Sequence, residues 1–187
     1  MRFIYRHLVI GFVLFFIVTA CNRKTDLKDE NFGRKEEFEI DGLKMSILLP
    51  NGWTRSSADG LPTFVQDCAD TVQFCPSIVV VSVSVSELTP LDTVASEFAS
   101  SISQKYEKSR VVRISTGNLR DVPMIGIDFK MKQNEIPVGG TTLFIRHQTK
   151  VISLNFMAGD NQKGEYKDNR LKFIKIVDSF EVNSSAR

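Results

Sequence analysis

The chain has 187 residues, with 24 lysines plus arginines against 22 aspartates plus glutamates and a formal net charge of +2 at neutral pH. This near-neutral balance gives no electrostatic case for binding nucleic acid or another polyanion, so nucleic acid is not an expected partner. The chain has no internal repeats and no low-complexity tract, and its length after the first 37 residues suits one domain that buries about two thirds of its surface.

The first residues predict an export signal. Arg2 and Arg6 precede an uncharged apolar run at residues 8–20, which is too short to span a bilayer as a stable helix. Residues 18–21 (Val-Thr-Ala-Cys) resemble the lipobox of bacterial lipoproteins, in which the cysteine thiol is acylated and the chain is cut before it. The resemblance implies that residues 1–20 are a cleaved signal peptide and that Cys21 carries fatty acids such as palmitate. An ordinary secretory signal and a short membrane anchor are the alternatives.

The segment after this cysteine predicts a location and a tether. Loss of the leader removes Arg2 and Arg6 and leaves 22 basic and 22 acidic side chains. Resemblance to lipoproteins of Gram-negative envelopes implies that Asn22, in place of aspartate, permits transfer to the outer membrane, facing the periplasm. Residues 21–37 are rich in charge and poor in large apolar side chains, so we expect a lipidated N-terminus and flexible tether. The globular domain is expected at residues 38–187.

Alternating apolar residues then predict strands. Phe38 and Ile40 precede the turn signal Asp41-Gly42, and a second alternating run reaches Leu49, which predicts a β-hairpin. Another pair of strands is expected near Phe64 and over residues 78–85. In the strand at residues 78–85, Val79, Val81 and Val83 alternate with Val80, Ser82 and Ser84. We therefore expect one apolar face and one face of small, mostly polar side chains.

Cys68 and Cys75 lie between these strands, separated by six residues. In an exported chain whose Cys21 is lipidated, the even remainder predicts a disulfide, worth roughly 2–3 kcal/mol for a loop of about eight residues. A redox-active pair is the alternative, although such pairs are usually Cys-x-x-Cys. A zinc site is disfavoured, since the mature chain adds only His147 as a further ligand. We therefore expect no metal and no cofactor.

The second half of the chain predicts two helices separated by strands. Thr89 as N-cap and Pro90 at the first helical position begin one helix, whose apolar face runs to Tyr106. A last helix is expected at about residues 164–177. Strands are expected over residues 111–114, 125–131, 142–146 and 151–157, with a glycine-rich connection at residues 138–140.

A turn at Gln148-Thr149 fixes the register of the last two strands. It pairs Ile145 with Ile152 and Leu143 with Leu154, so both strands bury the same face. The order of elements predicts an α+β fold, in which a mostly antiparallel β-sheet carries two main helices.

Several stretches of the sequence resemble the PsbP-like fold: residues 47–53 (Ile-Leu-Leu-Pro-Asn-Gly-Trp), residues 121–126 (Asp-Val-Pro-Met-Ile-Gly) and residues 173–180 (Phe-Ile-Lys-Ile-Val-Asp-Ser-Phe). This fold is shared by extrinsic photosystem II subunits, a Ran-binding nuclear import factor and bacterial envelope lipoproteins of the DcrB type. The resemblance implies an α/β/α sandwich and a role in binding or assembly. It does not cover the insertion between Cys68 and Cys75.

The polar side of the predicted sheet holds the candidate binding residues. By alternation they project away from the apolar face, so that Asp128 and Arg146 flank a groove for a small ligand or a partner peptide. A solvated face with a cross-strand ion pair is the alternative. The candidate binding face consists of Ser84, Asp128, Arg146, Ser153 and Asn155.

No residue set forms a catalytic signature. His147, the only histidine after the leader, lies beside a predicted turn with no nucleophile motif, so no catalytic residue is assigned. We expect a lipid-anchored, non-catalytic envelope protein that binds or assembles with a protein partner. The alternatives are a small-molecule-binding lipoprotein and, after it, an envelope hydrolase or redox enzyme.

Overall fold

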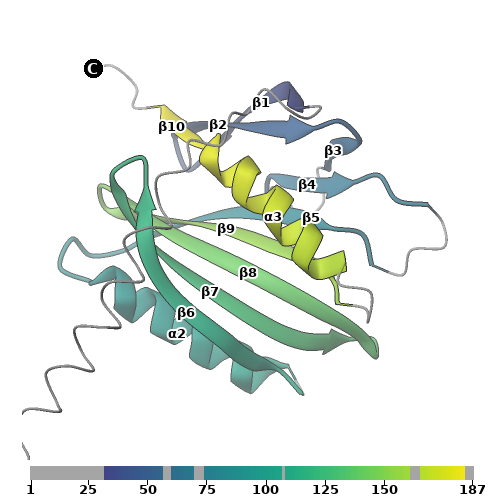
Figure 1. Cartoon of the computed structure of the whole chain (residues 1–187). Coiled ribbons are helices and arrows are strands. Elements are labelled where there is room, and N and C mark those ends of the chain that lie inside the picture. The colour runs from purple at the N-terminus through teal and green to yellow at the C-terminus, as the bar shows by residue number, and fades with distance from the viewer. Residues whose placement is uncertain (1–31, 57–59, 70–73, 107, 161–164, 184–187) are drawn as a thin grey trace, which may run out of the picture. The chain divides into compact units, whose positions relative to one another are not determined.

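A computed structural model describes residues 32–56, 60–69, 74–106, 108–160 and 165–183. The predicted signal peptide, Cys21 and most of the predicted tether lie outside these residues. The described part is an α+β domain, as the order of sequence elements predicts (Figure 1).

Ten strands and two helices follow one another in this part of the chain. In order they are β1 (Phe32–Ile40), β2 (Leu43–Pro50), β3 (Trp53–Ser56), β4 (Thr63–Gln66), β5 (Ser77–Ser84), α2 (Leu91–Lys105), β6 (Arg110–Leu119), β7 (Val122–Gln133), β8 (Ile136–His147), β9 (Lys150–Gly159), α3 (Glu165–Asp178) and β10 (Glu181–Asn183).

A small antiparallel sheet has the strand order β1-β2-β10. Its predicted hairpin is confirmed, because Asp41 and Gly42 form the turn with positive φ angles of 51° and 77°, as a two-residue hairpin turn requires. The predicted limit of the tether is wrong. β1 begins at Phe32, inside residues 21–37, because its backbone pairs with β2 as far as Pro50 and this pairing orders a charged sequence that has little apolar surface of its own.

The larger sheet is antiparallel, with the strand order β3-β4-β5-β9-β8-β7-β6. The predicted register between β8 and β9 is confirmed, since Ile145 lies opposite Ile152 and Leu143 opposite Leu154. Gln148, with a φ of 55°, forms the turn between them.

The glycine pair at positions 139 and 140 lies within β8 instead of forming the predicted connection. Each glycine makes room for a ring. A Cβ at Gly139 would lie 2.5 Å from the ring of Tyr166, and a Cβ at Gly140 would lie 2.1 Å from that of Phe129. These contacts come from other elements, so the local sequence favours a loop where tertiary packing requires small strand residues.

The two helices cover opposite faces of the larger sheet (Figure 1). α2 packs on β6, β7 and β8, whereas α3 packs on β8 and β9 and also on β2 of the small sheet. α2 begins one residue later than predicted, with Pro90 as its N-cap and no side-chain cap hydrogen bond. The predicted apolar face ends at Ile102, because Tyr106 is the C-cap residue and is exposed.

The main core lies on the α3 face. There the rings of Phe156 and Phe173 stack with centroids 4.9 Å apart. The predicted apolar face of β5 is wrong, since Val83 is 51% exposed whereas Val80, on the other face, is fully buried. The buried face of β5 is the one that packs toward α3 and the small sheet. The opposite face is less covered, because α2 packs on β6, β7 and β8 instead of β5. The alternation of valines alone does not reveal this difference.

Candidate functional site

The predicted binding residues do not share one face of the sheet. Directly paired residues of an antiparallel sheet lie on the same face, and consecutive residues lie on opposite faces. Asp128 pairs with Thr141, and Asn155 pairs with the next residue, Thr142. Asp128 therefore lies on the α3 face and Asn155 on the α2 face.

The other predicted residues follow the same rule. Ser153 pairs with Phe144 and Arg146 with Val151, which places both on the α2 face, whereas Ser84 pairs with Lys150 on the α3 face. The prediction that Asp128 and Arg146 flank one groove is therefore wrong. Alternation along the strands predicts one buried and one solvated face, but a helix packs on each face of this sheet.

The predicted residues on the α2 face form hydrogen bonds within the domain. Asn155 accepts a hydrogen bond from Thr142 at 3.0 Å and donates to the Val79 carbonyl oxygen at 3.2 Å and the Ser153 hydroxyl at 3.0 Å. Arg146 donates to the carbonyl oxygens of Ser86 and Thr89 and so braces the chain entering α2.

Asp128 is the centre of a polar cluster on the α3 face, which we call the Asp128 cluster. Its carboxylate accepts hydrogen bonds from Arg113 of β6 at 2.6 and 2.9 Å and from Arg170 of α3 at 3.1 Å through two nitrogens. Thr141 of β8 donates to the same carboxylate at 2.7 Å. Its hydroxyl lies 2.9 Å from that of Tyr166, which donates to the Gly140 carbonyl oxygen at 2.8 Å.

The electrostatics of this cluster keep Asp128 ionised. Burial raises the pKa of its carboxyl group, but hydrogen bonds from Thr141, Arg170 and Arg113, with the charge of Arg170, bring the pKa below its ordinary value. Burial is the main cause of the raised pKa of Tyr166, so its hydroxyl stays protonated at neutral pH. Two guanidinium groups and one carboxylate give the cluster one excess positive charge.

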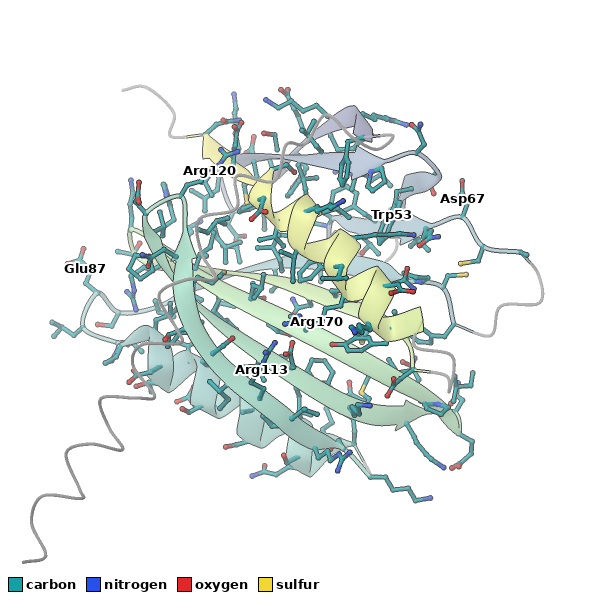
Figure 2. The ribbon with its side chains drawn as sticks, in the orientation of Figure 1. Trp53, Asp67, Glu87, Arg113, Arg120 and Arg170 are labelled. Atoms are coloured by element: carbon teal, nitrogen blue, oxygen red, sulfur yellow. The ribbon has the colours of Figure 1, made fainter. Side chains whose placement is uncertain are left out.

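The cluster opens toward β6. The side chain of Asp128 is 14% exposed and that of Arg170 24%, but that of Arg113 is 55% exposed. Figure 2 shows Arg113 and Arg170 pointing toward one another from β6 and α3. Sequence reasoning missed Arg113, Thr141 and Arg170 as partners of Asp128. The spacing of four residues that places Tyr166 and Arg170 on one helical face was an available signal.

A cleft of about 350 Å³ lies at another end of the larger sheet. Buried apolar side chains and basic side chains both contribute to its walls. It is lined by Leu119, Arg120, Val122, Ile145, Arg146, His147, Phe180, Glu181, Val182 and Asn183. Arg120 lies in the wall of this cleft. It donates to the Glu181 carboxylate at 2.8 Å and to the Asp178 carbonyl oxygen at 3.1 Å.

The predicted disulfide is not formed in this structure, where Cys68 and Cys75 are free thiols. The Cys68 thiol donates to the Gln66 carbonyl oxygen at 3.4 Å. Burial, followed by a hydrogen bond with the neighbouring Cys75, raises the pKa of Cys68 to about 12. A thiol with this pKa is protonated at neutral pH and is a poor nucleophile.

Known structures resemble this domain although its sequence does not identify a family. No protein-family model matches the chain, and no curated protein matches it either. The structure of LpqN, described as involved in cell envelope biogenesis of Mycobacterium tuberculosis, has a TM-score of 0.58 at 15% identity over 81% of this chain and 91% of LpqN. Cyanobacterial PsbP from Synechocystis has a TM-score of 0.54 at 13% identity, over 80% of this chain and 92% of PsbP. The chain has a PsbP-like fold.

A third structure widens the range of proteins that share the PsbP-like fold. The Ran-binding protein Mog1p of Saccharomyces cerevisiae has a TM-score of 0.56 at 12% identity, over 80% of this chain and 95% of Mog1p. At such identities the likeness establishes the fold alone. None of the helices in the described part of the PsbP-like domain is long and apolar enough to cross a membrane. Its described residues also contain no group of three or more histidine, cysteine, aspartate or glutamate side chains able to hold a metal ion.

Proposed function

We propose that the chain is a lipid-anchored protein of the bacterial envelope that binds a protein partner through its PsbP-like domain. The geometry of the Asp128 cluster is the observation that carries this proposal. Its carboxylate already accepts hydrogen bonds from three side chains and has a lowered pKa, which makes it a weak base. Its outer arginine is exposed and positively charged. This arrangement suits recognition better than proton transfer.

One similar structure supports an envelope location, and another supports a binding role. LpqN is described as taking part in cell envelope biogenesis and Mog1p as Ran-binding. Both bear the fold of this chain at low identity, so they favour an envelope binding or assembly module without naming its partner. A DcrB-type lipoprotein of the outer membrane, facing the periplasm, is the particular form that we propose.

The anchor and the cysteine pair form one testable part of the proposal. In the oxidising periplasm we expect Cys21 to carry lipid and the adjacent thiols of Cys68 and Cys75 to join as a disulfide. Mass spectrometry of natively expressed protein should find the chain starting at Cys21 with attached acyl chains, and residues 68 and 75 linked until a reductant is added. An intact leader or an unmodified Cys21 would contradict the anchor, and free thiols in unreduced protein would contradict the disulfide.

Photo-crosslinking in intact cells tests the binding role. A photoreactive residue is placed, one at a time, at exposed positions on three different elements: Ser115 of β6, Val83 of β5 and Leu171 of α3. We expect at least one position to give a specific protein adduct, and the other positions then serve as controls for random capture. If none of the three yields a specific adduct while the full-length protein is present at normal levels, the binding role is wrong.

The cleft of about 350 Å³ favours a second candidate, the small-molecule-binding lipoprotein. Its volume lies in the range of small-molecule pockets, and its walls combine apolar side chains with an equal number of charged or polar ones. A rise in the melting temperature of the full-length protein with a small molecule, abolished by filling the cleft with Val182→Trp, would favour this candidate.

A further inference from the structure

We infer that β6 binds an extended, acidic segment of a partner protein as an added strand, with a carboxylate of that segment against Arg113 and Arg170. This inference rests on the proposed binding role and specifies its site and the chemistry of the partner. β6 combines an exposed sheet edge, an excess of positive charge and exposed apolar side chains.

β6 is the last strand of the larger sheet and pairs only with β7 among the described strands. An edge strand presents unpaired N–H and C=O groups along its outer side, to which an extended segment can bind. All residues of β6 except Val111 and Leu119 are exposed. Its length of ten residues offers a longer edge than β3, the four-residue strand at the other end of this sheet.

The charges of β6 select the class of partner. Its only charged residues are Arg110 and Arg113, so a second copy of this strand would bring positive charges near one another and supply no carboxylate. A β-bulge between Val111 and Arg113 further interrupts regular pairing, and both features are typical of edges that avoid self-association. An acidic segment is complementary to them.

The Asp128 cluster supplies a site for one carboxylate of that segment. Arg113 and Arg170 each bind Asp128 through Nε and Nη2, which leaves their Nη1 groups outside these hydrogen bonds. A side chain on an added strand, directly opposite Arg113 and on the same face, lies about 5 Å away from it. Asp128 is a positioning residue here, because it holds two like-charged groups side by side.

Exposed apolar side chains of β6 indicate that the partner segment also carries apolar residues. Ile114, next to Arg113, pairs with Ile127 and so faces the α2 side, where its side chain is 55% exposed. Val112 is 53% exposed. Since successive side chains of a strand alternate between faces, the bound segment should alternate acidic and apolar residues.

A blocked, fluorescently labelled peptide of alternating glutamate and valine is the probe for this site. Fluorescence anisotropy with the full-length protein in detergent should show saturable binding, and the matching glutamine–valine peptide should bind at least about tenfold more weakly, because a neutral amide cannot replace the carboxylate. Arg113→Ala should cause a similar loss. Arg55→Ala makes the same charge change on β3 and should leave binding unchanged.

Backbone methylation separates strand addition from simple charge attraction. Two further peptides carry backbone N-methyl groups on alternate residues, one on its glutamates and the other on its valines. In an added strand, only every second residue points its N–H group toward β6. We therefore expect one methylated peptide to lose binding and the other to keep it. Equal binding of both, or unaltered binding to Arg113→Ala, would overturn the inference.

The cellular experiment keeps this inference distinct from the binding role. An adduct from Ser115 that disappears in the Arg113→Glu protein supports both. An adduct from Val83 or Leu171 that survives Arg113→Glu, with none from Ser115, supports a binding role and overturns the assignment to β6. A Ser115 adduct consisting of two copies of this chain would also overturn it.

Discussion

Replacing Phe173 by alanine should lower the free energy of unfolding by about 3–5 kcal/mol. The side chain is fully buried, and its ring stacks on Phe156 at an interplanar angle of 11°. α3 packs against strands of both sheets, so the cavity would open where these elements meet. A loss of this size is a large part of the 5–15 kcal/mol that is typical of a domain. Urea denaturation, followed by the fluorescence of the buried Trp53, measures it.

Leu171→Ala is the matched control for this prediction. Leu171 lies two residues earlier in α3 and is 53% exposed, so its truncation should change stability by less than about 1 kcal/mol. Equal losses for the two variants would mean that α3 does not pack on the sheet through Phe173.

Asp128→Ala should lower the free energy of unfolding by about 2–3 kcal/mol. The change removes the shared acceptor of Arg113, Arg170 and Thr141 and leaves two guanidinium groups facing one another. Arg113→Ala should cost less than about 1 kcal/mol, because that side chain is 55% exposed and its ion pair is screened by solvent. Denaturation of the two variants should therefore rank them in this order, and a smaller loss for Asp128→Ala would contradict it.

The acid dependence of stability gives a second measurement on Asp128. Its pKa in the folded protein is below the ordinary value of 3.8, so its contribution to stability is present above that value and is lost as pH falls toward the folded pKa. Asp128→Asn removes this ionisation. We therefore expect the variant to lose less stability than the wild-type protein on acidification through this range, and parallel curves would exclude a stabilising role for the carboxylate.

Local signals in the sequence predicted much of the fold. Asp41-Gly42 favours a tight turn by backbone geometry alone, and apolar alternation on both sides of Gln148 fixes a register that the structure confirms. These features depend on residues close together in the chain. The start of β1 and the role of Gly139 and Gly140 were missed, because each depends on a distant partner: β2 in the first case and the rings of Tyr166 and Phe129 in the second.

The candidate site was predicted only in part. Asp128 was predicted as a polar strand residue and lies in β7, but its predicted neighbour Arg146 lies on the other face of the sheet. Its actual partners come from β6, β8 and α3, separated from it by 15, 13 and 42 residues. The alternation of side chains along a strand shows which residues share a side. It does not show which helix covers that side.

Residue preferences and the spacing of apolar residues along short segments are enough to predict the alternation of strands and helices, the tight turns and the α+β class. Three-dimensional packing, in contrast, sets which sheet face meets which helix, where β1 begins and which charges surround Asp128. Those outcomes depend on strand order and on packing between distant segments, and a single sequence carries no local pattern that encodes either one.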